Sequence, residues 1–329
     1  MARITAAFGS SHSVMLVTEA EDWIEKFRVS DRRMPLYGRG GETLTYDGLL
    51  AAAPADAEDR VTPEKMIERH RQTDASILKL RAAIEATPLD ALIIVGDDQH
   101  ELFLDAMMPS LAIFYGDTIR NAGAPETMPE DWYKRAQMRR REPDGDIHYP
   151  VHGKLALHLI TGLTKNGFDI TAVKSIPPDQ HEGHAYSYIH RTYLPARKSL
   201  PIIPVFMNTY YEPNPVSPSR CVKLGRAIKA LVESYPDDLR VGIIASGGLS
   251  HFVVDEELDH GLIEAFRKND LDYLGALPPE RLKAGSSEIR SWICAAAAAE
   301  GLGLAWIDYI PAYRTPALTG AGLGFAQWS

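Results

Sequence analysis

The chain has few cysteines and no long apolar run. Only two of its 329 residues are cysteine, Cys221 and Cys294. Their spacing excludes a C-x-x-C metal motif and gives no disulfide framework, which is typical of a reducing compartment. No apolar stretch reaches the ~18 residues of a membrane-spanning helix, and no signal-peptide pattern opens the chain. We therefore expect a cytoplasmic protein with no membrane partner.

Concentrated positive charge is also missing. The 35 lysines and arginines are outnumbered by 44 acidic residues, which gives a net charge of −9. The one basic cluster, residues 139–141, stands beside acidic residues, and we interpret it as a solvated surface face. Because binding to phosphates needs a basic patch, we expect no nucleic-acid partner.

No repeat or clear linker divides the chain, so we predict a single domain over residues 1–329. Its hydrophobic content of 45% is enough for a large core. Short apolar runs predict strands at residues 4–8, 91–95, 110–115, 170–174, 202–206, 241–245 and 304–307. Helical periods and start signals predict helices at residues 64–86, 152–166, 220–234 and 287–300. This alternation predicts an α/β fold with a central sheet flanked by helices.

Two stretches interrupt the alternation. A loop-rich insertion with some helix is expected at about residues 20–85, where glycine, proline and "AAAPADAEDR" precede the predicted helix. A second excursion at about residues 116–151 contains "NAGAPETMPEDW" and a charged patch. Long loops in a compact domain are often binding loops, so we predict that the second excursion is a lid.

Polar residues follow several of the predicted strands. In "ALIIVGDDQHELF" an apolar strand runs directly into Asp97, Asp98, Gln99, His100 and Glu101. Ligands in open α/β sheets bind beyond the carboxyl ends of the strands. The sequence therefore places a site here without ranking these five residues.

Four further positions are candidates for chemistry. His12 follows the first strand in "GSSH", and His251 follows Gly247 and Gly248, which permit a sharp turn. Glu288 stands at a helix start, where an acid is also common for electrostatic reasons alone. "DQHEGHAYSYIHR" contains three histidines without a helical period, so we interpret it as a polar pocket wall. Imidazole or amide donors with one carboxylate are typical of non-haem Fe(II), and a separate histidine would serve as acid and base.

Several blocks in order carry a family resemblance. They are "MARITAAFGSSHSVML", "DALIIVGDDQHELFLDAMMPSLAIF", "GKLALHLITGLTKNGFDITAV", "IIPVFMNTYYEPNPVSPSRC", "GGLSHF", "GSSEIRSWI" and "YIPAYRTPALTGAGLG". With them the chain resembles the class III (LigB-type) extradiol ring-cleavage dioxygenases, the superfamily of the protocatechuate 4,5-dioxygenase catalytic chain. The resemblance implies a single catalytic domain with a central mixed sheet and Fe(II) to which an aromatic substrate and O2 bind. It also implies a homodimer, or a complex with a separate small subunit.

The resemblance assigns roles to individual residues. It makes His12 and Glu288 metal ligands and His251 the catalytic acid and base. It places His184 and Asn208 beside the substrate.

One position departs from the family pattern, which has Asn-Asp-His after this strand. Alignment without a gap puts Gln99 at the position of the ligand histidine, and His100 falls one residue late. A slip of one residue reverses the face to which a strand side chain points. We favour Gln99 as the ligand, through its carbonyl oxygen, over a bulge that turns His100 inward.

The leading hypothesis is therefore an Fe(II)-dependent extradiol dioxygenase for a catecholic or methoxylated aromatic acid. Arg314 or a nearby basic residue would pair with the substrate carboxylate. Because an amide replaces the imidazole, the alternative is a metal-dependent lyase or hydrolase that uses the same site on an aromatic compound without O2. A third hypothesis, a non-catalytic subunit, is weakened by the presence of His12, His251 and Glu288.

Overall fold

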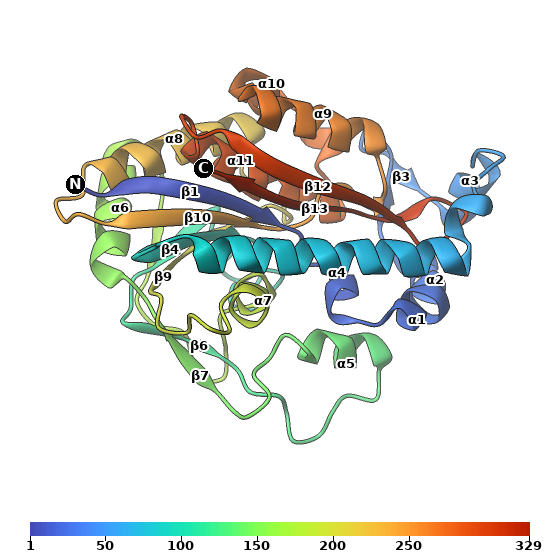
Figure 1. Ribbon diagram of the computed structural model, residues 1–329, viewed down its shortest axis with the longest axis horizontal. Coiled ribbons are helices and arrows are strands. Elements are labelled where there is room, and N and C mark those ends of the chain that lie inside the picture. Colours follow the sequence, from blue (N-terminus) through green and yellow to red (C-terminus); the bar gives the residue numbers. More distant parts are fainter.

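The computed structural model describes all residues from Met1 to Ser329. Its centre is a nine-stranded mixed sheet in the order β11-β13-β1-β10-β4-β9-β5-β8, with β12 paired to β13 (Figure 1). The strands are β1 (Arg3–Ser10), β4 (Ala91–Gly96), β5 (Leu111–Phe114), β8 (Thr171–Val173), β9 (Ile202–Met207), β10 (Arg240–Ser246), β11 (His251–Val253), β12 (Leu304–Tyr313) and β13 (Thr319–Trp328). Strands β1, β10, β4 and β9 are parallel, whereas β13 runs antiparallel to β1. The predicted α/β class with a central mixed sheet is confirmed.

Helices cover both faces of the sheet (Figure 1). One face packs against α6 (Gly153–Lys165), α8 (Pro218–Glu233), α9 (Glu256–Lys268), α10 (Leu271–Gly275) and α11 (Ile289–Ala298). The other packs against α4 (Pro63–Ala86) and α7 (His184–Tyr193). Every residue of β4 is buried, because a parallel strand covered on both faces has no solvent side. Alternate side chains such as Ile93 and Ile94 therefore enter two different cores.

The two excursions contain short elements. Residues 20–62 form α1 (Ala20–Asp22), α2 (Arg28–Ser30), α3 (Tyr46–Ala51) and the two-stranded pair β2 (Leu36–Tyr37) and β3 (Thr43–Leu44). The helix predicted at 64–86 is present as α4, capped by Thr62 with Pro63 in its first turn. The excursion at 116–151 contains the hairpin strands β6 (Thr118–Asn121) and β7 (Ile147–Pro150), with α5 (Trp132–Met138) between them. Its function as a lid stays a prediction.

The prediction for residues 181–190 was wrong in one respect. His181, His184 and Ser187 do line a pocket, but the segment also contains α7, which begins at His184. The residue before the helix, Gly183, has no capping side chain, so the sequence carries no clear start signal for it. No helix of the protein combines the length and apolarity needed to cross a membrane.

Candidate active site

The carboxyl ends of three neighbouring parallel strands meet at one edge of the sheet. His12 lies two residues beyond β1, Asp97 directly follows β4, and Gly247 directly follows β10. The pairing of Ser10 with Ser246 aligns the ends of β1 and β10. The turn after β10 leads into His251, so the strand order itself brings these segments together.

Four donors, three of them buried and one (His184) half-buried, converge at this edge. Ligand atoms of His12, Asp97, His184 and Glu288 all lie within 4.8 Å of one another. His12 Nε2 is 3.2 Å from His184 Nε2 and 3.2 Å from Glu288 Oε2. Asp97 Oδ1 is 3.7 Å from His12 Nε2 and 3.6 Å from His184 Nε2. Adjacent ligands at ~2.1 Å from one metal ion are ~3.0–3.4 Å apart, so the two shortest distances match a shared cation.

Both imidazoles are oriented by a partner on the opposite ring nitrogen. His12 Nδ1 lies 3.0 Å from Ser246 Oγ, whose own hydroxyl donates to the carbonyl of Ala185 at 2.7 Å. His184 Nδ1 lies 2.6 Å from Glu101 Oε2. Because Nδ1 donates in each case, each Nε2 points into the cluster, and its lone pair is available to a metal ion once that nitrogen carries no proton. Such an acceptor behind the ring is the usual support of a metal-binding histidine.

The charges at the cluster are unbalanced. Asp97 Oδ1 is buried and accepts no hydrogen bond, and burial raises the pKa of this carboxyl. Burial also opposes ionisation of Glu288, but His12 and His251 hold its pKa well below the ordinary value. For His184 burial disfavours the charge, yet Glu101 and Asp97 raise its pKa to about 9. A divalent cation would satisfy the orphaned oxygen and both carboxylates, so these residues fit a metal ion.

Gln99 and His100 point in different directions. Gln99 lines the pocket, and its Nε2 lies 3.0 Å from Asp97 Oδ2 and 3.4 Å from Glu288 Oε1. His100 adopts a φ of 62° and stacks on Tyr211 with ring centroids 3.9 Å apart. Residue 99 therefore faces the pocket, whereas His100 does not line it. Carboxylates only accept hydrogen bonds, so the amide donates to them, and ligation by Gln99 through its carbonyl oxygen stays a prediction.

His251 stands at the edge of the donor cluster. Its Nδ1 donates to the carbonyl of Leu249 at 2.8 Å, and its Nε2 is 3.5 Å from Glu288 Oε1. Burial disfavours a charge on His251, but Glu288 outweighs it and raises the pKa of the imidazole. A Cβ on Gly285 would lie 1.9 Å from His251 Cδ2, so glycine is required there for the ring to fit. The neutral ring carries a free lone pair on Nε2, which suits a base.

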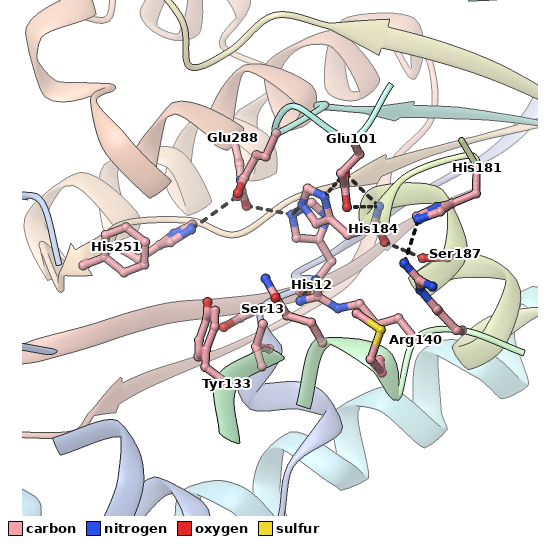
Figure 2. Close-up of a pocket in the computed structure, with 16 residues that line it drawn as sticks. His12, Ser13, Glu101, Tyr133, Arg140, His181, His184, Ser187, His251 and Glu288 are labelled. Atoms are coloured by element: carbon pink, nitrogen blue, oxygen red, sulfur yellow. Dashed lines mark hydrogen bonds and ion pairs between the residues drawn. The ribbon is translucent and has the colours of Figure 1, made fainter. Parts of the chain in front are cut away.

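These residues surround a cavity of about 300 Å³. Figure 2 shows His251 at one end, the cluster of Glu288, His12 and His184 in the middle, and His181 at the other end. A single substituted aromatic ring fits a cavity of this size.

Comparison with known proteins decides the family. The family model described as "Catalytic LigB subunit of aromatic ring-opening dioxygenase" matches residues 63–324. The chain belongs to this LigB family.

Two curated relatives are similar over part of their length. A 2,3-dihydroxyphenylpropionate/2,3-dihydroxicinnamic acid 1,2-dioxygenase of Comamonas testosteroni is 26% identical over 63% of this chain and 54% of its own. A gallate dioxygenase of Pseudomonas putida is 36% identical over 32% of this chain and 30% of its own. The chain thus spans about half of the first relative and less than a third of the second.

Within this LigB-family chain, two expectations about basic residues were wrong. Arg140 and Arg141 line the pocket, and Arg140 is buried, so residues 139–141 are not simply a solvated face. Arg314 is buried in an ion pair with Asp31, 2.8 Å from Nη2 to Oδ1, and does not line the pocket. Its charge fastens the insertion to the domain and is not available to a substrate.

The two predicted substrate contacts differ in outcome. His184 lines the pocket and belongs to the donor cluster. Asn208 lies outside the lining, where its amide donates to the carbonyl of Tyr211 and to Asn214 and accepts from the amides of Tyr210 and Tyr211. It shapes that turn, and its role beside the substrate stays a prediction.

Sequence reasoning missed several residues of the site. Asp97, a member of the donor cluster, was one of five unranked polar residues, and its place directly after β4 was the signal that could have singled it out. Tyr133, Arg140 and Arg141 come from the long excursion, where no strand end marks a site. His181 was noticed only as part of a histidine-rich segment.

Proposed function

We propose that this chain is an Fe(II)-dependent extradiol dioxygenase that opens the ring of a catecholic aromatic acid. One observation carries the proposal: four donors, one of which has a carboxylate oxygen without a hydrogen-bond partner, stand beside a histidine that can accept a proton at Nε2. The LigB family model supports ring opening. The names of both relatives, which are dioxygenases of dihydroxyphenylpropionate and gallate, support a hydroxylated aromatic acid as substrate.

His12, His184 and Glu288 would hold the metal as a set of two histidines and one carboxylate, with Asp97 as the fourth donor. When bound, Fe(II) supplies a Lewis acid for the substrate hydroxyls and an open position for O2. Glu101 and Ser246 keep the two imidazoles oriented with Nε2 towards the centre. Gln99 fixes the two carboxylates by donating its amide hydrogens to them.

His251 would handle the proton. The carbonyl of Leu249 holds the hydrogen on Nδ1, so Nε2 accepts the proton of a substrate hydroxyl. Glu288 Oε1, 3.5 Å away, stabilises the resulting imidazolium. The same Nε2 can later return the proton to the opened product.

The test is anaerobic loading with Fe(II), followed by oxygen uptake and absorbance of a yellow ring-fission product with a panel of catechols and gallates. We expect uptake with at least one aromatic acid of the panel. An enzyme with full iron occupancy that consumes no oxygen with any member contradicts the proposal.

One observation favours a second candidate, a metal-dependent lyase or hydrolase on an aromatic compound. The donor set contains two carboxylates, and an amide stands where the family pattern has a histidine. Carboxylate and amide oxygens also suit Mn(II). Turnover without O2 by the Mn(II)- or Zn(II)-loaded protein would support this candidate over the first.

The homodimer, the separate small subunit and the cytoplasmic location stay predictions. Light scattering of the purified chain measures its mass in solution and therefore tests the homodimer directly. Full activity of the chain alone would argue against a required small subunit.

A further inference from the structure

Arg140 is a buried cation without an anion. Its guanidinium lines the pocket but forms no ion pair with any carboxylate of the protein within 4.0 Å. Its Nη2 donates to the carbonyl of His12 at 2.6 Å, and its Nε has no hydrogen-bond partner. Of the two other buried arginines, Arg314 is neutralised by Asp31, and Arg290 donates to four backbone carbonyls. Arg140 has neither kind of compensation in full, because its Nε lacks any acceptor, so an anion in the pocket would stabilise this buried charge.

Arg141 and His181 form a second contact that lacks an acceptor. His181 Nδ1 accepts the backbone hydrogen of Gly183 at 3.2 Å, so the neutral ring carries its hydrogen on Nε2. This Nε2 lies 3.3 Å from Nη2 of Arg141, which also only donates. Two donors therefore face each other across the pocket wall. An anion that accepts from both would remove the conflict.

The three residues share one end of the cavity. All line the same pocket, and Figure 2 shows Arg140 and His181 on the side of His12 and His184 that is away from His251. Burial and the nearby Arg141 lower the pKa of His181, which fits a neutral ring in a cationic surrounding. This end thus offers several hydrogen-bond donors and one fully buried positive charge.

We propose that Arg140, Arg141 and His181 form the subsite for the carboxylate of the aromatic substrate, at the end of the pocket opposite His251. The inference rests on the proposed function only for the identity of the ring that carries the carboxylate. It orients the substrate: the hydroxyls face the donor cluster and His251, and the acidic group lies on the far side of the ring. Arginine suits this role because its planar fork matches a carboxylate.

The test compares benzoate with benzamide, which has nearly the same shape but no charge. Isothermal titration of the metal-loaded protein under argon measures both affinities. We expect benzoate to bind roughly 10- to 100-fold more tightly, as charge-assisted hydrogen bonds require. The preference should fall to a few-fold in Arg141→Met. Equal affinities in the unaltered protein overturn the proposal.

Arg139→Met is the matched control. Arg139 is the adjacent arginine, donates to the carbonyl of Val17 and does not line the pocket. The substitution removes the same charge and should leave the preference for benzoate intact. If Arg139→Met lowers the affinity for benzoate as much as Arg141→Met does, the preference comes only from long-range electrostatic attraction, and the proposed subsite is wrong.

Arg140→Lys tests the planar guanidinium group separately from its charge, because lysine keeps the charge but cannot form two parallel hydrogen bonds to a carboxylate. We expect a partial loss of the preference, with metal content and circular dichroism unchanged. If the preference survives intact in both Arg140→Lys and Arg141→Met, benzoate binds elsewhere, such as on the metal, and the proposal fails.

The outcomes also separate this proposal from the proposed function. A preference for benzoate without oxygen uptake on any catechol supports the subsite and contradicts the dioxygenase. Oxygen uptake with catechol itself, without a preference for acids, supports the dioxygenase and overturns the subsite.

Discussion

The pocket has two walls that differ in how their charges are satisfied. The sheet wall consists of His12, His251 and Glu288, together with Asp97, which contacts His12 but does not line the pocket. These residues follow strands or begin a helix and are linked to one another. The cover wall consists of Tyr133, Arg140, Arg141 and His181, which come from the excursion and from the loop before α7. Charges on the sheet wall are linked in one network, whereas the cations of the cover wall have no carboxylate partner. From this difference we propose that the sheet wall performs the chemistry and that the cover wall selects the substrate.

The largest effect is expected from His12→Ala on the sheet wall. The substitution removes a donor 3.2 Å from two others, so metal affinity should fall by more than roughly 100-fold and activity should be lost. Metal analysis after dialysis and oxygen uptake measure both. His100→Ala is the control, because His100 stacks on Tyr211 outside the cluster and should keep the metal. If His100→Ala loses the metal and His12→Ala keeps it, then His100 and not His12 is the metal ligand.

His251→Gln should separate chemistry from metal binding within the sheet wall. The amide keeps much of the shape but cannot accept and return a proton, so kcat should fall roughly 10²- to 10⁴-fold. Metal content should not change, because His251 contacts Glu288 but lies outside the four-donor cluster. His260→Gln on α9 serves as the control for loss of a histidine. A variant that retains normal kcat would remove His251 from the mechanism.

The sheet wall is also the part that the sequence predicts best. Apolar runs and start signals are local, so β1, β4, β10 and the start of α4 were expected nearly where they lie. The strand ends then placed His12, the segment at Asp97 and His251 at one edge, and the family resemblance supplied Glu288. The structure brings these residues together at one edge of the sheet, and their catalytic and ligand roles stay predictions.

The cover wall could not be predicted in this way. Arg140 reaches the site through a hydrogen bond to a residue 128 positions away, and nothing in the local pattern of residues 139–141 marks one arginine as buried. Helix α7 follows Gly183, which has no capping side chain, and β13 is rich in glycine, which is uncommon in strands. Each of these features depends on long-range packing and not on local periodicity.

Asp259→Asn tests the support behind the sheet wall. Asp259 accepts hydrogen bonds from Ser250 and Tyr309, next to His251. Burial raises its pKa to about 6 in spite of these hydrogen bonds. A raised folded-state pKa stabilises the protein below about pH 4, and this stabilisation is lost as the pH rises through about 6.

Between about pH 4 and pH 6 the free energy of unfolding of the wild type should therefore fall by up to about 3 kcal/mol because of Asp259. The free energy of unfolding of the asparagine variant should not show this fall. Urea unfolding of both proteins at pH 4.5 and pH 7 measures the change in their difference. Asp238→Asn, an exposed carboxylate, is the control. If the difference between wild type and Asp259→Asn is the same at both pH values, Asp259 ionises normally.

The smallest effect is expected from Tyr133→Phe on the cover wall. Tyr133 lines the pocket from α5, and burial raises the pKa of its hydroxyl, so the group stays protonated and donates. Loss of one such hydrogen bond should raise KM by roughly 2- to 10-fold with kcat and metal content unchanged. Steady-state kinetics against Tyr273→Phe, a half-exposed tyrosine on α10, measures the effect. A fall in kcat at constant KM would mean that the cover wall takes part in the chemistry, and the division of labour between the two walls would no longer hold.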